Sequence, residues 1–199
     1  QDCSGEMEAF EEYLTGCFPN SDRLSDEVSR AVFQSGGKRL RPRLTIMFSM
    51  TGEDYDRTKA FSAAASVEML HTATLVHDDI IDDADNRRGV PTVNIKYGNH
   101  MAVYVGDYLL LKAAGEMMKL GSYDENSVKR IHGALSSICA GEIDQYFSRG
   151  HIESVLSYLR RIRKKTALMF GAACALGAYN SGRGEDAVDC AFRFGTDFG

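Results

Sequence analysis

The chain has 199 residues, of which 44% are hydrophobic and 26% are charged, and its formal net charge is -5. This composition is typical of a globular domain with a substantial core, and the negative charge argues against a nucleic-acid-binding protein. The five cysteines are scattered without a CxxC pair, so they indicate neither a zinc site nor a disulfide framework. No signal peptide is visible and the longest apolar run, residues 167–178, is too short to span a bilayer, so we expect a cytoplasmic protein.

Helical periodicity dominates the sequence, and no segment alternates convincingly as a strand would. Three prolines in the whole chain favour long uninterrupted helices. We therefore predict an all-α domain spanning residues 1–199. The predicted helices cover approximately residues 6–17, 25–35, 42–50, 54–82, 101–120, 125–148, 152–177 and 185–198.

Paired glycines, Gly36 and Gly37, end the second predicted helix and are followed by Lys38, Arg39 and Arg41. Glycines let the backbone approach a ligand, and the N-terminus of the next helix also favours an anion. The segment lacks the GxxxxGK[ST] spacing of a Walker A loop. It indicates an anion-binding turn, and the alternative is a charge cluster exposed to solvent.

The fourth predicted helix, with Asp54 as its cap, has an interior rich in small and apolar residues. Some of these residues recur at helical spacing, which predicts a stripe along one face of the helix. The stripe consists of Ala64, Val67, Leu70, Thr74 and His77 or Asp78. A polar loop is expected to follow this helix.

Acidic residues gather where this helix ends. Asp78 and Asp82 share one helix face, and Asp79 lies one residue off it. Like charges at this spacing repel by about 0.2–0.5 kcal/mol, and acids are unfavourable at the negative end of the helix dipole. Mg2+ between the carboxylates would remove both penalties. The alternative is an acidic loop that is exposed to solvent.

Two adjacent arginines, Arg87 and Arg88, follow the acidic segment and precede Gly89. Guanidinium groups match phosphate oxygens well, although pairing with Asp83 and Asp85 is the alternative. The acidic helix end and the two basic segments together indicate a pocket for metal ions and two diphosphates.

Four segments give the chain its resemblance to the trans-isoprenyl diphosphate synthases, which make farnesyl, geranylgeranyl and longer polyprenyl diphosphates. The segments are GGKRLRP at 36–42, HTATLVHDDIID at 71–82, NRRG at 86–89 and KTALMF at 165–170. The resemblance implies an isoprenoid synthase fold, in which long helices surround a central cavity. It also implies a Mg2+-dependent prenyltransferase that condenses isopentenyl diphosphate with an allylic diphosphate.

The resemblance assigns roles to matching positions. It implies that Asp78 and Asp82 are Mg2+ ligands and that Asp79 assists them. The implied contacts of isopentenyl diphosphate are Lys38, Arg41, His71 and Arg88.

On the allylic side, the resemblance implies that Arg87 contacts the diphosphate. Lys165 and Thr166 are implied to touch this diphosphate and the developing carbocation. Gln145 is a further candidate that would face the cavity. Taken alone, Lys165 would be a residue of a solvated basic face, Thr166 would bond its own backbone, and Gln145 would be a surface residue.

Product length is predicted from the residues that precede Asp78. Ala73 and Thr74 lie about 6–7.5 Å along the helix from it. Bulky aromatics at these positions block the growing chain in this family, and both residues here are small. We therefore predict a product longer than farnesyl diphosphate and beyond geranylgeranyl diphosphate.

The family carries a second aspartate-rich motif, which would follow the helix near Phe192, and residues 1–199 end before it. We therefore expect this chain to hold one half of the metal site. The resemblance also implies a homodimer, and the amphiphilic product implies proximity to a membrane without a spanning segment. The alternative functions are a class I terpene cyclase, a non-catalytic subunit of a heteromeric synthase, and an all-α binding module.

Overall fold

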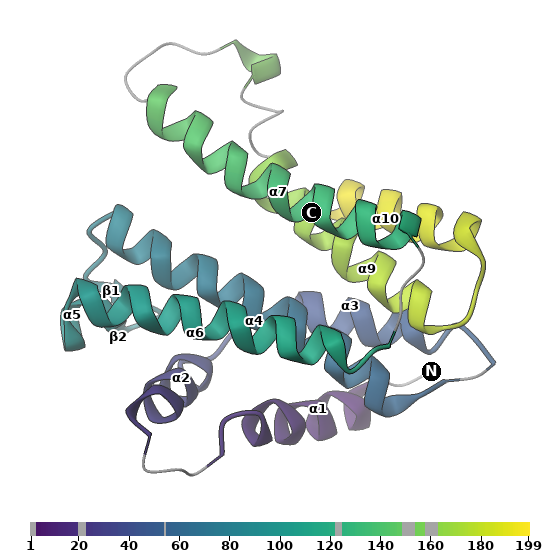
Figure 1. Cartoon of the computed structure of the whole chain (residues 1–199), viewed down its shortest axis with the longest axis horizontal. Helices are drawn as coiled ribbons and strands as arrows, with labels where there is room; N and C mark the ends of the chain where they lie inside the picture. The colour runs from purple at the N-terminus through teal and green to yellow at the C-terminus, as the bar shows by residue number, and fades with distance from the viewer. Residues whose placement is uncertain (1–2, 20–22, 54, 122–124, 149–153, 158–162) are drawn as a thin grey trace.

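The structure, a computed structural model, describes residues 3–19, 23–53, 55–121, 125–148, 154–157 and 163–199 (Figure 1). Helices dominate these residues, and the all-α prediction is confirmed. The elements are α1 (Ser4–Gly16), α2 (Leu24–Gln34), α3 (Leu40–Ser49), α4 (Arg57–Ile81), β1 (Asn86–Arg87), β2 (Val90–Pro91), α5 (Val93–Tyr97), α6 (Asn99–Met118), α7 (Glu125–Ser148), the π-helical turn η1 (Arg163–Ala167), α9 (Leu168–Asn180) and α10 (Glu185–Phe198).

Most predicted helices are confirmed within three residues at each end, and α7 and α10 have the predicted bounds. The prediction of a single helix over residues 152–177 is wrong for the part that the structure describes, because η1 precedes α9 and α9 continues to Asn180. The loop predicted after α4 contains the hairpin and α5. Strands of two residues and a helix of five are too short to produce a periodic signal.

Helix α4 runs through the centre of the fold, with α6 beside it and α3 and α9 packed against it as well (Figure 1). The Asp56 carboxylate caps it by accepting a hydrogen bond from the Lys59 backbone N–H at 3.1 Å. The predicted cap, Asp54, lies outside the described residues.

Residues 60–69 of α4 are all buried, so in this stretch burial includes the predicted stripe and extends to every other face of the helix. Helices surround this part of α4, and its many alanines allow their close approach. Beyond it the burial becomes one-sided. There Ala73 packs in the main core with α6, whereas Thr74 is only half-buried.

The hairpin places two arginines beside the end of α4. Strands β1 and β2 are antiparallel, with Asn86 opposite Pro91 and Arg87 opposite Val90. The two residues between them, Arg88 and Gly89, both have positive φ angles of 55° and 83°. This is the conformation of a tight two-residue hairpin turn, and it explains the glycine.

Close packing of α9 on α3 fixes the helix that follows the basic turn. A side chain on Gly177 of α9 would collide with the Thr45 carbonyl oxygen and would lie 2.7 Å from Cβ of Phe48, both on α3. Glycine is therefore required for this approach.

Among the described residues, no helix has the length and hydropathy needed to cross a membrane.

We predict that Gly177→Ala lowers the free energy of unfolding by about 1–3 kcal/mol, because the added methyl group overpacks the contact between α3 and α9. Chemical denaturation followed by circular dichroism measures it. Gly115→Ala is the matched control, since nothing lies within 4 Å of a Cβ at Gly115 in α6, and it should raise stability by about 0.5–1 kcal/mol. Equal effects of the two substitutions would contradict the packing argument.

Candidate functional site

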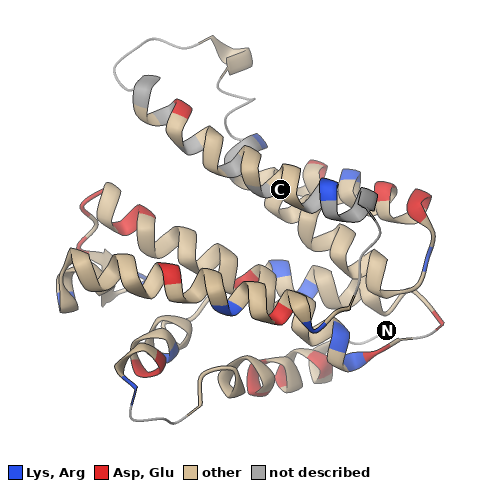
Figure 2. Ribbon diagram, in the orientation of Figure 1, with Lys and Arg blue, Asp and Glu red and all other residues tan. Residues whose placement is uncertain are grey.

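The acidic residues of the site lie at the C-terminal end of α4, where the helix meets the loop to β1 (Figure 2). Asp78 is half-buried on the last turn and Asp82 is the exposed C-cap residue, whose backbone N–H donates to the Asp78 carbonyl. The structure therefore places both predicted metal ligands on neighbouring turns of one helix end.

Asp79 points to a different side of α4. Its carboxylate is buried and accepts hydrogen bonds from Nε of Arg87 at 3.0 and 3.1 Å and from Nη2 at 2.6 Å. Hydrogen bonding to Asp79 is the main cause that raises the pKa of Arg87. Successive residues of a helix are 100° apart, which turns Asp79 towards the hairpin. The ion-pair partner of Arg87 is thus Asp79, not the suggested Asp83 or Asp85.

The glycine-flanked basic turn meets the hairpin arginine. A Cβ on Gly37 would lie 2.7 Å from Nη1 of Arg88, so this guanidinium lies close against the turn. Lys38 is exposed on the same turn. The two basic segments that the sequence singled out, almost fifty positions apart, therefore lie against each other.

Arg41 completes this group from the first turn of α3. Its guanidinium carbon lies 4.2 Å from the centre of the Phe170 ring of α9, and its Nε is buried without a hydrogen-bond partner among the described residues. Burial lowers the pKa of Arg41, although the charge of Glu68 opposes this. An anion that reached Nε would supply the missing acceptor.

His71 lies among these arginines on α4. Burial lowers its pKa to about 3, and the positive charges of Arg41, Arg88 and Arg87 contribute to this shift. The imidazole is therefore neutral at pH 7, and the surrounding charge is positive. A diphosphate is the type of ligand that such a cluster accommodates.

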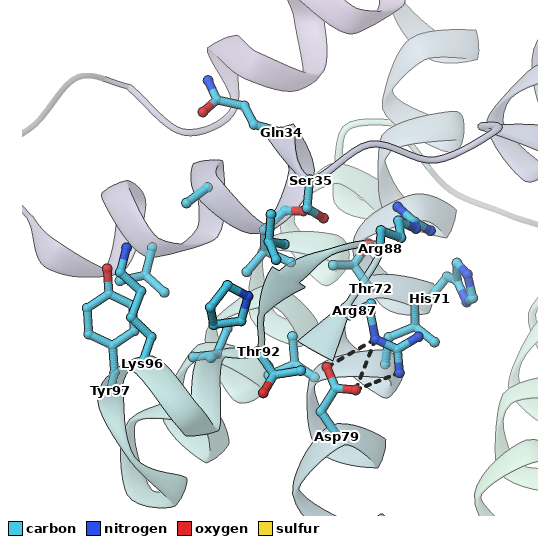
Figure 3. Close-up of a pocket in the computed structure, with 18 of the residues that line it drawn as sticks. Gln34, Ser35, His71, Thr72, Asp79, Arg87, Arg88, Thr92, Lys96 and Tyr97 are labelled. Atoms are coloured by element: carbon cyan, nitrogen blue, oxygen red, sulfur yellow. Dashed lines mark hydrogen bonds and ion pairs between the residues drawn. The ribbon is translucent and has the colours of Figure 1, made fainter. Parts of the chain in front are cut away.

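A pocket of about 550 Å³ lies between α2, the hairpin, α5 and α4 (Figure 3). The surface of its wall is mainly apolar, with Arg88 and His71 towards one end and Lys96 and Tyr97 towards the other. Asp79 lines it, whereas Asp78 and Asp82 do not. The ion pair of Asp79 with Arg87 thus separates this pocket from the side of α4 that carries the predicted metal ligands.

The remaining predicted residues are placed only partly. Thr166 is half-buried in η1, one turn before Phe170, and π-helical turns are frequent at functional sites. The side chains of Lys165 and Gln145 lie outside the described residues. Thr74 lies near the side of α4 that carries Asp78, and its hydroxyl donates to the His71 carbonyl at 2.7 Å.

The acidic residues fit a magnesium ion that a ligand completes. Within the described ranges, no group of three or more His, Cys, Asp or Glu side chains could form a ready metal cage. Mg2+ commonly binds through one or two carboxylates and takes its other ligands from water and substrate phosphates. Asp78 and Asp82 supply such a donor set.

Comparisons with known proteins agree with this arrangement. The family described as polyprenyl synthetase matches residues 22–199. Heptaprenyl diphosphate synthase component 2 of Geobacillus stearothermophilus is 38% identical over 193 residues, which cover 96% of this chain and 59% of that protein. The chain belongs to the polyprenyl synthetase family, and it spans about six-tenths of the length of this relative.

Solved structures agree in fold. The crystal structure of heptaprenyl diphosphate synthase from Staphylococcus aureus matches with a TM-score of 0.91 at 30% identity, over 98% of this chain and 62% of that one. A polyprenyl synthase from Caulobacter crescentus, complexed with calcium and isoprenyl diphosphate, matches with a TM-score of 0.88 at 29% identity, over 99% and 60% of the two chains. The predicted isoprenoid synthase fold is confirmed.

Sequence reasoning missed Glu68 and Phe170 as parts of this region. Glu68 is a single acid within an otherwise apolar stretch of α4 and is buried. Such an acid requires a cationic partner, which was a readable signal. Phe170 closes the quoted segment KTALMF, but nothing in its spacing indicates that an arginine would stack on it.

We predict that the free energy of unfolding decreases as the pH falls from about 6.5 towards 3, in part because of His71. The pKa of His71 is about 3 in the folded protein and near 6.5 in an unfolded chain, so only the unfolded state takes up this proton between those values. Above pH 6.5 the contribution is constant. Urea denaturation at a series of pH values should show a smaller decrease for His71→Gln, and identical slopes would contradict the assignment.

Proposed function

We propose that this chain carries part of a prenyltransferase that condenses isopentenyl diphosphate with an allylic diphosphate. This part contains the isopentenyl diphosphate site and the first of the two aspartate-rich metal-binding motifs. The observation that carries the proposal is the convergence of Arg41, His71 and Arg88 beside Gly37, next to a helix end with two acids on one side. Family membership supports the same reaction class.

The basic cluster would hold isopentenyl diphosphate. Nε of Arg41 lacks an acceptor among the described residues. The Arg88 guanidinium packs on Gly37, and Lys38 is exposed on the same turn. Neutral His71 adds a hydrogen-bonding group without adding charge repulsion. Together these groups orient isopentenyl diphosphate so that its carbon–carbon double bond faces the end of α4.

The acidic helix end would receive the allylic diphosphate through Mg2+. Asp78 and Asp82 would hold Mg2+, which when bound would supply the positive charge that stabilises the departing diphosphate. The carbon–oxygen bond of the allylic substrate breaks, the alkene of isopentenyl diphosphate forms the new carbon–carbon bond, and a proton leaves to the released diphosphate. Asp79 is proposed to hold Arg87 in place beside this diphosphate, a role other than the metal assistance first predicted.

We predict that Asp78→Ala and Asp82→Ala abolish the Mg2+-dependent binding of a non-hydrolysable allylic diphosphate and lower turnover by at least about 10²–10³-fold, because charge on the leaving group is no longer neutralised. Helicity should be unchanged. Isothermal titration calorimetry measures binding, and mass spectrometry measures prenyl transfer.

Asp85→Asn is the control for this test, since its side chain is exposed in the same acidic segment but lies outside the proposed metal site. It should bind as the unaltered chain does. Near-normal binding by both alanine variants would contradict the assignment of the metal ligands. An unaltered chain that binds neither diphosphate in the presence of Mg2+ would contradict the proposed function itself.

Product length is proposed to depend on the side of α4 that lies below Asp78. We predict that Thr74→Phe shortens the product, because an aromatic ring at this half-buried position would block the growing chain. Ala73→Phe should also shorten it, but Ala73 is fully buried in the core, so this variant also loses stability from overpacking. Mass spectrometry of the products decides, and an unchanged distribution in Thr74→Phe would contradict this path.

Two alternatives make different predictions. A class I terpene cyclase would have no use for a second diphosphate site, so consumption of isopentenyl diphosphate separates it from a synthase. A non-catalytic subunit would be expected to lack the aspartates that this chain retains at positions 78 and 82. The arrangement of Arg41, His71 and Arg88 favours the synthase over both.

The proposed partner is a second copy of the chain. Tyr104, Leu111 and Met118 recur every seven residues along α6, and they are 67%, 72% and 82% exposed. Large apolar side chains in a row on one helix face are typical of an interface. The Geobacillus relative is named as one component of a synthase, so a different subunit is the alternative partner. A cytoplasmic location with the product near a membrane remains part of the proposal.

A further inference from the structure

The turn between α2 and α3 contains a residue in an unusual conformation. Arg39 has φ 47° and ψ 39°, which lies in the left-handed region. This conformation costs an ordinary residue about 1–2 kcal/mol, and glycine or asparagine is the usual choice. The preceding residues, Gly36 and Gly37, also have positive φ angles but are glycines. An arginine at this position requires a compensating interaction of its side chain.

The Arg39 guanidinium makes that interaction with three different helices. Nε donates to Oε1 of Glu11 on α1 at 2.8 Å, and Nη1 donates to Oε1 of Glu68 on α4 at 2.9 Å. Nη2 donates to the carbonyl of Phe33 near the end of α2 at 2.8 Å. The turn is therefore fixed to α1, α2 and α4 at a single point.

This anchor is largely buried. The side chains of Arg39 and Glu68 are 10% and 7% exposed, whereas that of Glu11 is 46% exposed. Burial acts to lower the pKa of Arg39, but the hydrogen bond to Glu11 and the charge of Glu68 outweigh it, so the pKa is raised. Leaving Glu68 without its partner would strand a buried charge, which is costly.

The neighbours of Arg39 are the residues proposed to hold isopentenyl diphosphate. Lys38 precedes it, Arg41 follows two residues later, and Glu68 lies three residues before His71 on α4. The ion pair of Arg39 with Glu68 therefore sets the distance between the basic turn and His71. All three guanidinium nitrogens of Arg39 donate to protein groups, so this residue would act through its neighbours.

We propose that Arg39 is a positioning residue for the isopentenyl diphosphate site, and that Glu11 and Glu68 are its anchors. The proposal rests on the proposed function. Arginine is needed because only its planar fork reaches two carboxylates and a carbonyl in different directions. Loss of the anchor lets the turn move relative to α4, and Lys38, Arg41 and His71 then no longer meet on one diphosphate.

The test measures the dissociation constants of isopentenyl diphosphate and of a non-hydrolysable allylic diphosphate, each with Mg2+, by isothermal titration calorimetry. Arg39→Ala should raise the dissociation constant of isopentenyl diphosphate about 10-fold, because the contacts of the displaced turn with this ligand weaken. The dissociation constant of the allylic diphosphate should change by less than about 2-fold. Arg39→Lys should not restore the binding, because a single ammonium group cannot bridge both acids.

Two further variants separate the side chain from the backbone. Arg39→Gly accepts the left-handed conformation without strain, so it should be more stable than Arg39→Ala and yet bind isopentenyl diphosphate as weakly. Glu11→Gln should weaken the same ligand about 3-fold, although Glu11 lies on α1 and belongs to neither predicted diphosphate site.

Arg57→Ala is the matched control for stability. Arg57 also joins α4 to α1, since its Nη2 lies 3.0 Å from Oε1 of Glu6 and its guanidinium stacks on Phe61, but it does not touch the turn. This variant should leave the binding of isopentenyl diphosphate unchanged. The proposal is overturned if Arg39→Ala binds this ligand normally, or if Arg39→Ala and Arg57→Ala weaken both ligands alike. Failure of the proposed function has a different signature, because the unaltered chain would then bind neither ligand.

Discussion

Two groups of like charge gathered at the end of α4 are the constraint on which the rest of the structure depends. On one side of the helix end, Asp78 and Asp82 lie on neighbouring turns. Around the preceding turn, Arg41, Arg87 and Arg88 approach closely enough to contribute to the depressed pKa of His71. Each group repels itself, and in the proposed function each would be completed by the opposite charge of a ligand: metal ions for the acids and phosphate oxygens for the arginines.

Close packing of the surrounding helices holds these charged groups in place. Small side chains let α4 lie buried between its neighbours over residues 60–69, and Gly177 lets α9 press on α3. Three ion pairs then fix the hairpin and the basic turn to this frame. Arg87 is held by Asp79, and Arg39 is held by Glu68 and Glu11. The charged residues that remain for a ligand are thus presented from a rigid background.

Helices and the principal site segments could be predicted from the sequence because their signals are local. Long periodic stretches predicted α7 and α10 at their observed bounds, and clustered acids and arginines are visible in a one-dimensional reading. The pairing of Asp79 with Arg87 and the stacking of Arg41 on Phe170 could not be predicted in this way. These contacts depend on how the hairpin folds back and how α9 crosses α3, and neither is encoded in residue spacing. The hairpin itself was missed because its strands have two residues each.

In the proposed function, an anion completes the basic cluster around His71. The most direct measurement is an NMR titration of the His71 imidazole against pH, with and without saturating isopentenyl diphosphate. Without ligand, the account predicts a pKa of about 3. With ligand, the added negative charge must raise the pKa of His71 clearly, because it offsets the surrounding arginines. A pKa near 6.5 in the free protein, or one that the diphosphate leaves unchanged, would contradict the account.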